Sequence, residues 1–316
     1  MKYSTKFVMF SRQRKVLKDM ILNYKKLAIF IICAFLPMIG IGLVLHYMGA
    51  ATVEDLQANP MLAIIRFVLS AAAMLLPLFA VIVTRLIFRE PILKGLDISF
   101  KINRWWIAGW LLMPVIALAV LGVTLLMPGA KWTPGSEAIQ MALKSMPEGF
   151  GIWELIMITM VSGLFAGLTI NAVFGFGEEV AWRAFLPKLF EGKPFIIAVL
   201  WIGVIWGFWH APLILNGHNY PQHPVLGVFL MVVFCILLTP MLMYFKYKGG
   251  SVIVPAIMHG TFNAVVGVST LVVSPANDLL YGGPGLAGMI TLLLVDVSLF
   301  IYDRYISKER IFLSIL

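Results

Sequence analysis

The chain has 316 residues, of which 61% are hydrophobic and only 12% are charged, and this composition excludes an ordinary soluble globular domain. Its mean hydropathy of +0.95 instead predicts an all-α polytopic membrane protein. The formal net charge of +9 could suggest a nucleic-acid-binding protein. We expect no nucleic-acid partner, because the basic residues follow a pattern typical of membrane topology.

The apolar runs predict about eight membrane-spanning helices, since each run approaches the roughly 20 residues that a span needs. The runs begin near Leu27, Leu62, Trp106, Ile156, Phe195, Val225, Val252 and Leu286. If the N-terminus is cytoplasmic, alternate connecting segments place 21 of the 24 Lys and Arg residues in the cytoplasm. Only Arg66, Lys131 and Lys144 fall outside this set. The asymmetry therefore predicts that both termini are cytoplasmic.

Residues 1–26 form a basic cytoplasmic tail, which we interpret as a topology signal rather than as a site for anionic lipid headgroups. The tail lacks a short apolar core followed by a small-residue cleavage site. We therefore expect the first span to remain attached to the protein.

Residues 27–127 hold spans one to three, which carry few polar residues and are interpreted as a scaffold. Cys33 and Cys235 both fall within predicted spans, so we expect packing residues rather than a disulfide or a metal pair. Residues 128–150 are more polar and contain three prolines, which predicts an external loop with a short helix around Ser136 to Lys144.

Residues 151–306 contain spans four to eight and all the candidate catalytic residues, and residues 307–316 form a second cytoplasmic tail. The apolar segment from Ile156 to Phe190 is too long for one perpendicular helix, because about 35 residues would span roughly 52 Å. It must therefore tilt, bend or project. Gly163 with Gly167, and Gly175 with Gly177, predict close helix packing or a kink just before Glu178. The nine tryptophans are expected mostly at the membrane interfaces.

Glu178, Glu179 and Arg183 lie within this apolar segment. A carboxylate in the middle of a membrane helix costs at least about 2.5 to 3.5 kcal/mol, which indicates a functional site facing the protein interior. Glu179 and Arg183 stand at i and i+4 on one helix face, an arrangement that favours an ion pair. Glu178 points about 100° away from Glu179 and is left free for chemistry, for which burial suits it as a general base.

Two further motifs supply imidazole and amide groups. His210 ends an apolar run, and Pro212 is expected to perturb that helix end. His259 and Asn263 lie at i and i+4, so both can reach one point in the interior and stabilise an oxyanion. Counted from the cytoplasmic boundary, Glu178, His259 and Asn263 lie about 12 to 18 Å deep and His210 roughly 25 Å deep. We expect a tilted or displaced helix to bring His210 back to the others.

The motifs E-E-x-x-x-R, aromatic-x-x-x-H and H-x-x-x-N occur in this order on successive spans, between about Gly175 and Val265. This arrangement resembles the CAAX protease and bacteriocin-processing (CPBP, or Abi) family, which includes the Ras-converting CAAX endopeptidase. The second motif of that family usually has Phe four residues before its histidine. This chain has Trp206 there, so we expect a differently shaped aromatic wall.

The resemblance implies an intramembrane endopeptidase that forms no covalent intermediate. In it, Glu178 would activate a water with help from His210, His259 and Asn263 would bind the oxyanion, and Glu179 and Arg183 would support the site. Zinc is the alternative, since Glu178, His210 and His259 could supply three ligands and leave a position for water. The chain has no H-E-x-x-H helix, and we favour catalysis without a metal or other cofactor.

The expected partners are membrane lipids and a membrane-associated peptide, lipidated or not, that reaches the site from the bilayer or the cytoplasm. The motif style suggests a bacterial or archaeal protein of the plasma membrane. Two other function classes remain open: an ion- or proton-coupled transporter, and a non-catalytic binding protein such as a bacteriocin self-immunity factor. The lack of an internal repeat disfavours the transporter. The polar segment from His218 to His223 is interpreted as a connector, with a gate as the alternative.

Overall fold

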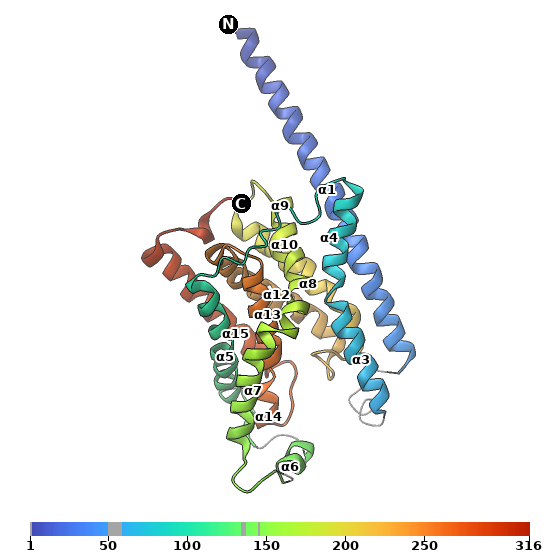
Figure 1. Cartoon of the computed structure of the whole chain (residues 1–316), viewed down its shortest axis with the longest axis vertical. Coiled ribbons are helices and arrows are strands. Elements are labelled where there is room, and N and C mark those ends of the chain that lie inside the picture. Colours follow the sequence, from blue (N-terminus) through green and yellow to red (C-terminus); the bar gives the residue numbers. More distant parts are fainter. Residues whose placement is uncertain (1, 50–58, 134–136, 145) are drawn as a thin grey trace.

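The computed structural model describes residues 2–49, 59–133, 137–144 and 146–316, and within them the chain is almost entirely helical (Figure 1). The first half holds α1 (Lys2–Tyr47), α3 (Pro60–Ala73), α4 (Leu76–Ile87), α5 (Arg104–Leu125), α6 (Glu137–Lys144), α7 (Ile152–Leu168) and α8 (Ile170–Glu179). The second half holds the π-helical segment η1 (Val180–Phe185), α9 (Leu186–Leu189), α10 (Phe195–Trp209), α11 (Ala211–Ile214), α12 (Pro224–Gly249), α13 (Ile253–Val265), α14 (Val268–Val272), α15 (Leu286–Ile301), η2 (Tyr302–Ser307) and η3 (Ile311–Leu313). Strands β1 (Lys131–Trp132) and β2 (Val273–Ser274) form a short antiparallel pair.

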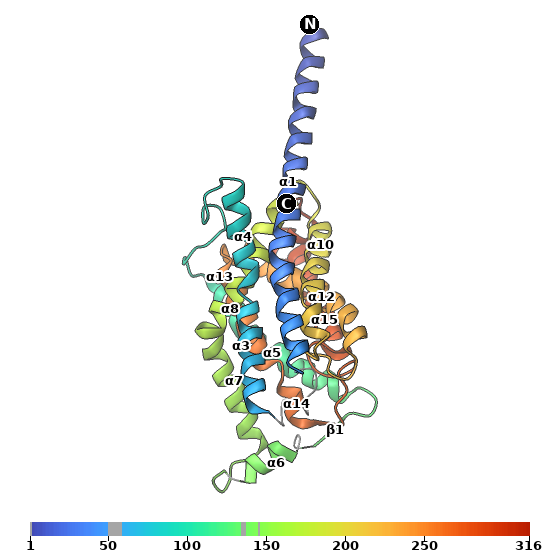
Figure 2. The same ribbon diagram turned by 90° about the vertical axis from the view of Figure 1, so that its right-hand side faces the viewer.

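The helices confirm the predicted class of protein. Among the described residues, seven helices are long and apolar enough to cross a membrane, and α7 with the helix that follows it forms a bent eighth. Most spans begin within a few residues of the predicted positions, and the first lies in the long helix α1. The start of α1 and the C-terminus lie at the same end of the bundle (Figures 1 and 2), as an even number of spans requires.

Local sequence signals explain where several helices begin and end. The Asn59 side chain accepts a hydrogen bond from the backbone N–H of Leu62, and Pro60 occupies the first helical position of α3. Asn103 caps α5 in the same way. At its other end α12 stops at Gly250, whose φ of 66° is the left-handed conformation that glycine adopts most easily. Capping residues and a terminal glycine therefore fix where these apolar helices begin and end, which hydropathy alone does not define.

Helix α13 lies at the centre of the bundle, where it packs against α5, α7, α8 and α12. In the span that α13 forms with α14, 67% of an 18-residue stretch is buried inside the protein, whereas only 22% of such a stretch is buried in the first span. Helices α1, α3 and α4 cover one edge of the bundle and α5 and α15 the opposite edge (Figure 1). The motif-bearing helices α8, α10 and α13 are therefore interior elements, as their polar residues require.

The long apolar segment bends, as predicted, but not just before Glu178. The 58° break separates α7 from α8 at Thr169, and the helix then widens into η1 directly after Glu179. The four glycines serve close packing instead of a kink. A Cβ at Gly163 or Gly167 would collide with α13, one at Gly175 would lie 2.6 Å from the Ala256 carbonyl oxygen, and one at Gly177 would lie 2.6 Å from that of Met74.

The short helix predicted in the polar loop is α6, Glu137–Lys144, while Ser136 lies outside the described residues. The expectation that tryptophans mostly anchor the membrane interfaces is wrong for Trp182, Trp206 and Trp209, each of which is at most 2% exposed in the core. Their indole N–H groups explain the difference, because each one donates a hydrogen bond inside the protein.

Candidate active site

The three motifs meet at one cavity of about 790 Å³, which extends from the buried motif residues to exposed side chains such as Phe67 and Ile170. Glu178 lines it from α8, His210 from the end of α10, and His259 and Asn263 from α13. The junction of α3 with α4 and the middle of α12 complete the wall. His210, which the depth count left farthest from the others, joins them because it sits at the break between α10 and α11.

Glu178 is 2% exposed, and one of its carboxylate oxygens is held by two indole groups. Trp206 Nε1 donates to Glu178 Oε2 at 2.7 Å, and Trp182 Nε1 donates to the same oxygen at 3.1 Å. Among the described residues, no side chain or backbone group donates to Oε1. The carboxylate is therefore fixed in orientation through Oε2 while Oε1 remains available.

The chain brings these donors to Glu178 from two directions. Trp182 follows Glu178 by four residues, across the point where α8 becomes the π-helical segment η1. Trp206 comes from α10, and its ring also lies 4.4 Å from the guanidinium carbon of Arg183. A π-helical turn is uncommon and is frequent at functional sites. Here the π-helical turn directly follows Glu179, and Glu178, Trp182 and Arg183 are all buried around it.

Glu179 links Arg183 to His259. Arg183 Nε lies 3.1 Å from Glu179 Oε2, and His259 Nδ1 donates to Glu179 Oε1 at 2.8 Å. The predicted ion pair is thus confirmed by distance, but its angle is poor, and no guanidinium nitrogen makes a well-directed hydrogen bond to a described residue. Arg183 is held by charge and by the face of Trp206, whereas His259 is oriented by a true hydrogen bond that leaves Nε2 for the cavity.

His210 is oriented by the way α10 ends. The backbone N–H of His210 bonds to the Gly207 carbonyl instead of to the carbonyl of Trp206, four residues back. The freed Trp206 oxygen lies 2.9 Å from His210 Nδ1 and accepts a hydrogen bond from it. Pro212 then prevents the helix from continuing, as expected from the sequence. Because Nδ1 carries the proton, Nε2 of the neutral ring is an acceptor.

Several cavity residues had no role in the sequence analysis. Asn171 of α8 lines the cavity and donates through Nδ2 to the Gly260 carbonyl oxygen at 3.1 Å, beside His259. The sequence could have indicated this residue, because Asn171 precedes Glu178 by seven positions and so lies on the same face of the helix. Cys235, expected only as a packing residue, is buried and also lines the cavity. His218 of the predicted connector lies at the cavity wall as well.

The trio proposed as alternative zinc ligands does not form a metal-binding group in this arrangement. In the described part of the chain, no three His, Cys, Asp or Glu side chains come together as a ligand set. The ligand atoms that a zinc ion would need therefore do not all point to one position.

The comparisons with known proteins agree with the motifs. Residues 153–265 match the sequence profile described as type II CAAX prenyl endopeptidase Rce1-like. Among curated proteins, no match to the chain is found. The matched segment starts within α7 and ends with α13, so it includes Glu178, His210, His259 and Asn263. Residues 153–265 are therefore similar to the domain of the Rce1-like CAAX prenyl endopeptidases, which confirms the predicted resemblance to the CAAX protease (CPBP) family.

Proposed function

We propose that this protein is an intramembrane endopeptidase that hydrolyses a peptide bond of a membrane-associated polypeptide through a water activated by Glu178. One observation carries the proposal: a buried carboxylate is fixed by two indole donors at Oε2, with Oε1 available, in a cavity that also holds His210, His259 and Asn263. Fixed polar groups in a mostly apolar pocket are the usual form of a catalytic site.

The proposed reaction assigns one task to each group. A water binds between Glu178 Oε1 and His210 Nε2, and Glu178 takes its proton as the oxygen attacks the scissile carbonyl carbon. The carbonyl oxygen becomes an oxyanion, which accepts hydrogen bonds from Asn263 Nδ2 and from His259. In its cationic form His259 keeps one N–H on Glu179 and presents the other at Nε2. Glu178 then gives its proton to the leaving nitrogen as the C–N bond breaks.

The walls of the cavity suit a substrate that is partly in the bilayer. Much of the lining is apolar, with side chains from α3, α4, α8 and α12 that include Phe67, Leu75, Phe174 and Phe234. A peptide attached to a lipid or to a membrane helix could place its apolar part there. We further propose a multi-pass protein of a prokaryotic plasma membrane, with lipids and a membrane-associated peptide as its partners. We propose that the hydrolysis proceeds without a metal.

The test is cleavage of a fluorogenic library of lipidated and unlipidated peptides by the purified protein in nanodiscs. Glu178→Gln should lower the rate by about 10² to 10⁴-fold, the range typical of a lost general base. The matched control is Glu154→Gln, because Glu154 only accepts a hydrogen bond from the backbone of Gly151 at the start of α7. Thermal unfolding should show that both variants are folded.

Two results would contradict the proposal. Equal cleavage by the wild type and Glu178→Gln would remove Glu178 from the reaction, and loss of activity with a chelator, restored by zinc, would replace the metal-free route. Proton or solute flux in liposomes that Glu178→Gln abolishes, without any peptide cleavage, would favour the transporter. Protection against a bacteriocin that survives Glu178→Gln would favour a non-catalytic immunity protein.

A further inference from the structure

His210 lies at a corner of the chain, between two helices of very different length. Helix α10 has 15 residues and ends at Trp209, whereas α11 is a single turn of four residues that begins at Ala211. In the proposed reaction His210 Nε2 binds the water, so the ring must be placed accurately. A misplacement of about 1 Å can lower the rate about 10²-fold. The position of His210 therefore depends on how both sides of this corner are fixed.

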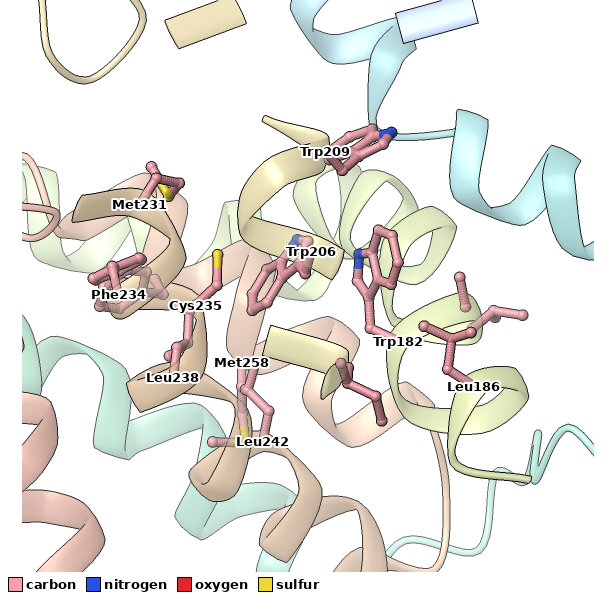
Figure 3. Close-up of a cluster of buried hydrophobic side chains, with 14 of the residues drawn as sticks. Trp182, Leu186, Trp206, Trp209, Met231, Phe234, Cys235, Leu238, Leu242 and Met258 are labelled. Atoms are coloured by element: carbon pink, nitrogen blue, oxygen red, sulfur yellow. The ribbon is translucent and has the colours of Figure 1, made fainter. Parts of the chain in front are cut away.

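The side before His210 is fixed by the packing of α10. Gly203 and Gly207 bring α10 directly against α12, because a Cβ at either position would collide with the α12 backbone. Trp206 and Trp209 lie in the buried cluster that Figure 3 shows. Many contacts along a long helix thus fix the chain up to His210, and the loss of a single one leaves the others in place.

The side after His210 is fixed by a contact with α1. Asn216, which follows α11, donates through Nδ2 to the Gly42 carbonyl oxygen at 3.0 Å and to the Pro212 carbonyl oxygen at 2.8 Å. Asn216 is 4% exposed, so both bonds lie in the protein interior. One amide group therefore ties the short helix α11 to the first span.

Gly42 allows α1 to approach α11 closely enough for this contact. A Cβ at Gly42 would lie 2.6 Å from Pro212 Cβ and 3.0 Å from the Pro212 carbonyl oxygen. Carbon atoms in ordinary contact are about 3.5 to 4.0 Å apart, so a side chain at Gly42 must push Pro212 away by about 1 Å. Pro212 is two residues from His210. A Cβ at Gly40, two residues away on the same helix, meets no described atom within 4 Å.

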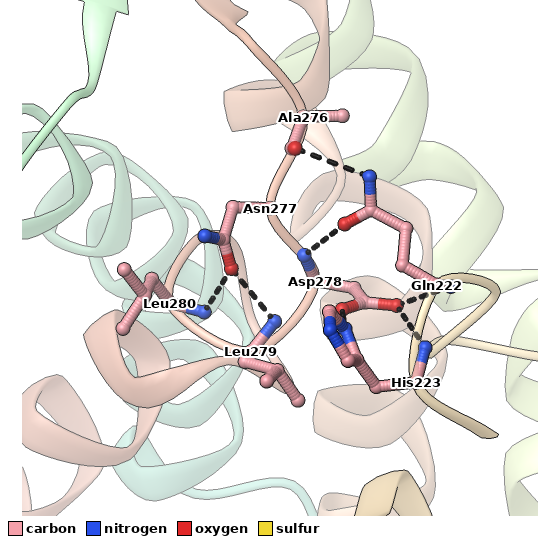
Figure 4. Close-up of polar contacts among 7 residues, drawn as sticks. All are labelled: Gln222, His223, Ala276, Asn277, Asp278, Leu279 and Leu280. Atoms are coloured by element: carbon pink, nitrogen blue, oxygen red, sulfur yellow. Dashed lines mark hydrogen bonds and ion pairs between the residues drawn. The ribbon is translucent and has the colours of Figure 1, made fainter.

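The far end of the same segment is fixed by the loop before α15 (Figure 4). Asp278 accepts hydrogen bonds from the backbone N–H groups of Gln222 at 2.6 Å and His223 at 3.2 Å, and from His223 Nδ1 at 2.7 Å. The chain between His210 and α12 is thus fixed at two places. The contact with α1 is the one beside the catalytic group, and the contact with Asp278 is at the start of α12.

We infer that Gly42 and Asn216 are positioning residues for His210, so that the first span takes part in catalysis as well as in the scaffold. Neither residue is among the described side chains that line the catalytic cavity. They act through the corner between α10 and α11. The importance of His210 for hydrolysis rests on the proposed function. The placement of its ring by α1 does not, and it can be measured without cleavage.

The first experiment observes the ring of His210 by NMR. Wild type, Gly42→Ala and Asn216→Ala are labelled with ¹⁵N in the histidine rings and compared in nanodiscs, with His210→Gln to assign the His210 signals. The wild type should show one tautomer with the proton on Nδ1, as the 2.9 Å contact with the Trp206 carbonyl oxygen requires. Both variants should shift these signals or show both tautomers, and Gly40→Ala should not. Unchanged His210 signals in both variants would overturn the inference.

The second experiment separates positioning from stability. In Gly42→Ala and Asn216→Ala, kcat for the best peptide of the library should fall about 10²-fold, with KM nearly unchanged. The control is Asn103→Ala, because the Asn103 amide also donates to two backbone carbonyls of another helix, those of Lys248 and Gly249. This variant should lower the unfolding temperature but change neither kcat nor the His210 signals. An equal loss of kcat in Asn103→Ala would reduce the effect to stability and overturn the inference.

The two proposals fail in different ways. If the wild type cleaves no peptide, the peptidase function fails, and the His210 signals still decide whether α1 positions the ring. Unchanged kcat in variants with altered His210 signals would overturn the catalytic part of the inference, and lowered kcat with unaltered signals would overturn the positioning. If Gly42→Ala does not fold, Asn216→Ala gives the same test, because it removes atoms and adds none.

Discussion

Trp206 Nε1 donates a 2.7 Å hydrogen bond to Glu178 Oε2 from a different helix. Trp182 adds a second bond to the same oxygen. Together the two bonds fix the orientation of the Glu178 carboxylate, which hydropathy alone does not predict. A phenyl ring at position 206 could not make this bond, because it has no N–H group.

The first prediction concerns these indole donors. Trp206→Phe keeps an aromatic ring beside Arg183 but removes one hydrogen bond to Glu178. A hydrogen bond to a charged group contributes about 1.5 to 3 kcal/mol, which corresponds to a decrease of about 10- to 100-fold in kcat. KM should change little, because Glu178 orients the water and not the peptide. Steady-state kinetics on the best peptide of the library measure both constants.

Trp209→Phe is the matched control for this measurement. Trp209 is as deeply buried as Trp206, but its indole donates to the Ala34 carbonyl oxygen at 3.2 Å and not to Glu178. It should lower the unfolding temperature without the loss of kcat. If both variants lost activity equally, the effect would be one of general packing.

The second prediction concerns the buried charges. Arg183→Ala leaves Glu179 without its charge partner in a site that is fully buried, and removal of one partner of a buried pair typically destabilises a protein by about 3 to 5 kcal/mol. Arg183→Lys should recover only part of this loss, since it lacks the planar group that lies on Trp206. Thermal unfolding in detergent measures the effect.

The control is Glu309→Gln, because the Glu309 carboxylate, which pairs with the 5% exposed Lys248 side chain, is itself 53% exposed to solvent. Since solvent screens the charge of Glu309, the unfolding temperature should fall much less than in Arg183→Ala. A similar loss for Arg183→Ala and Glu309→Gln would show that the buried network does not stabilise the fold.

The third prediction tests the close contact of α7 with α13. A Cβ at Gly167 would overlap the Thr261 side chain and lie 2.7 Å from the Thr261 Cα, so Gly167→Ala must separate the helices. Overpacking of this kind destabilises by about 1 to 3 kcal/mol. Activity should fall as well, because α13 carries His259 and Asn263. Gly122→Ala on α5 meets no atom within 4 Å and should change neither stability nor activity.

The fourth prediction concerns pH and His218 in the loop after α11. Burial, aided by the positive charge of Arg66, lowers the pKa of His218 from 6.5 to about 4. The unfolded chain therefore binds more protons than the folded protein between these values, and stability falls as the pH falls from about 6.5 toward 4. His218→Gln should weaken the pH dependence of the unfolding temperature in this window. His46→Gln, at an exposed position of α1, should leave it unchanged.

The helical class, the number of spans and the candidate residues were predictable from the sequence, because the bilayer imposes simple physical requirements. A span needs about 20 apolar residues, and a charge within it needs a partner or a function. Glu178, Glu179 and Arg183 could be recognised by their setting, and the spacing of Glu179 and Arg183 predicted their ion pair. Such signals come from neighbours in the chain, and they remain valid without knowledge of the fold.

Other features depend on contacts between segments far apart in the sequence. The bond from Trp206 to Glu178 joins residues 28 positions apart, and that from His259 to Glu179 joins residues 80 apart. The break at Thr169 and the widened turn after Glu179 follow from how α8 fits against α13 and α4, which no local pattern reveals. The sequence by itself thus determined which groups must be inside the membrane, since that depends on transfer from water. Only the tertiary structure decided which atoms meet, because close packing of the helices brings together side chains that are far apart in the sequence.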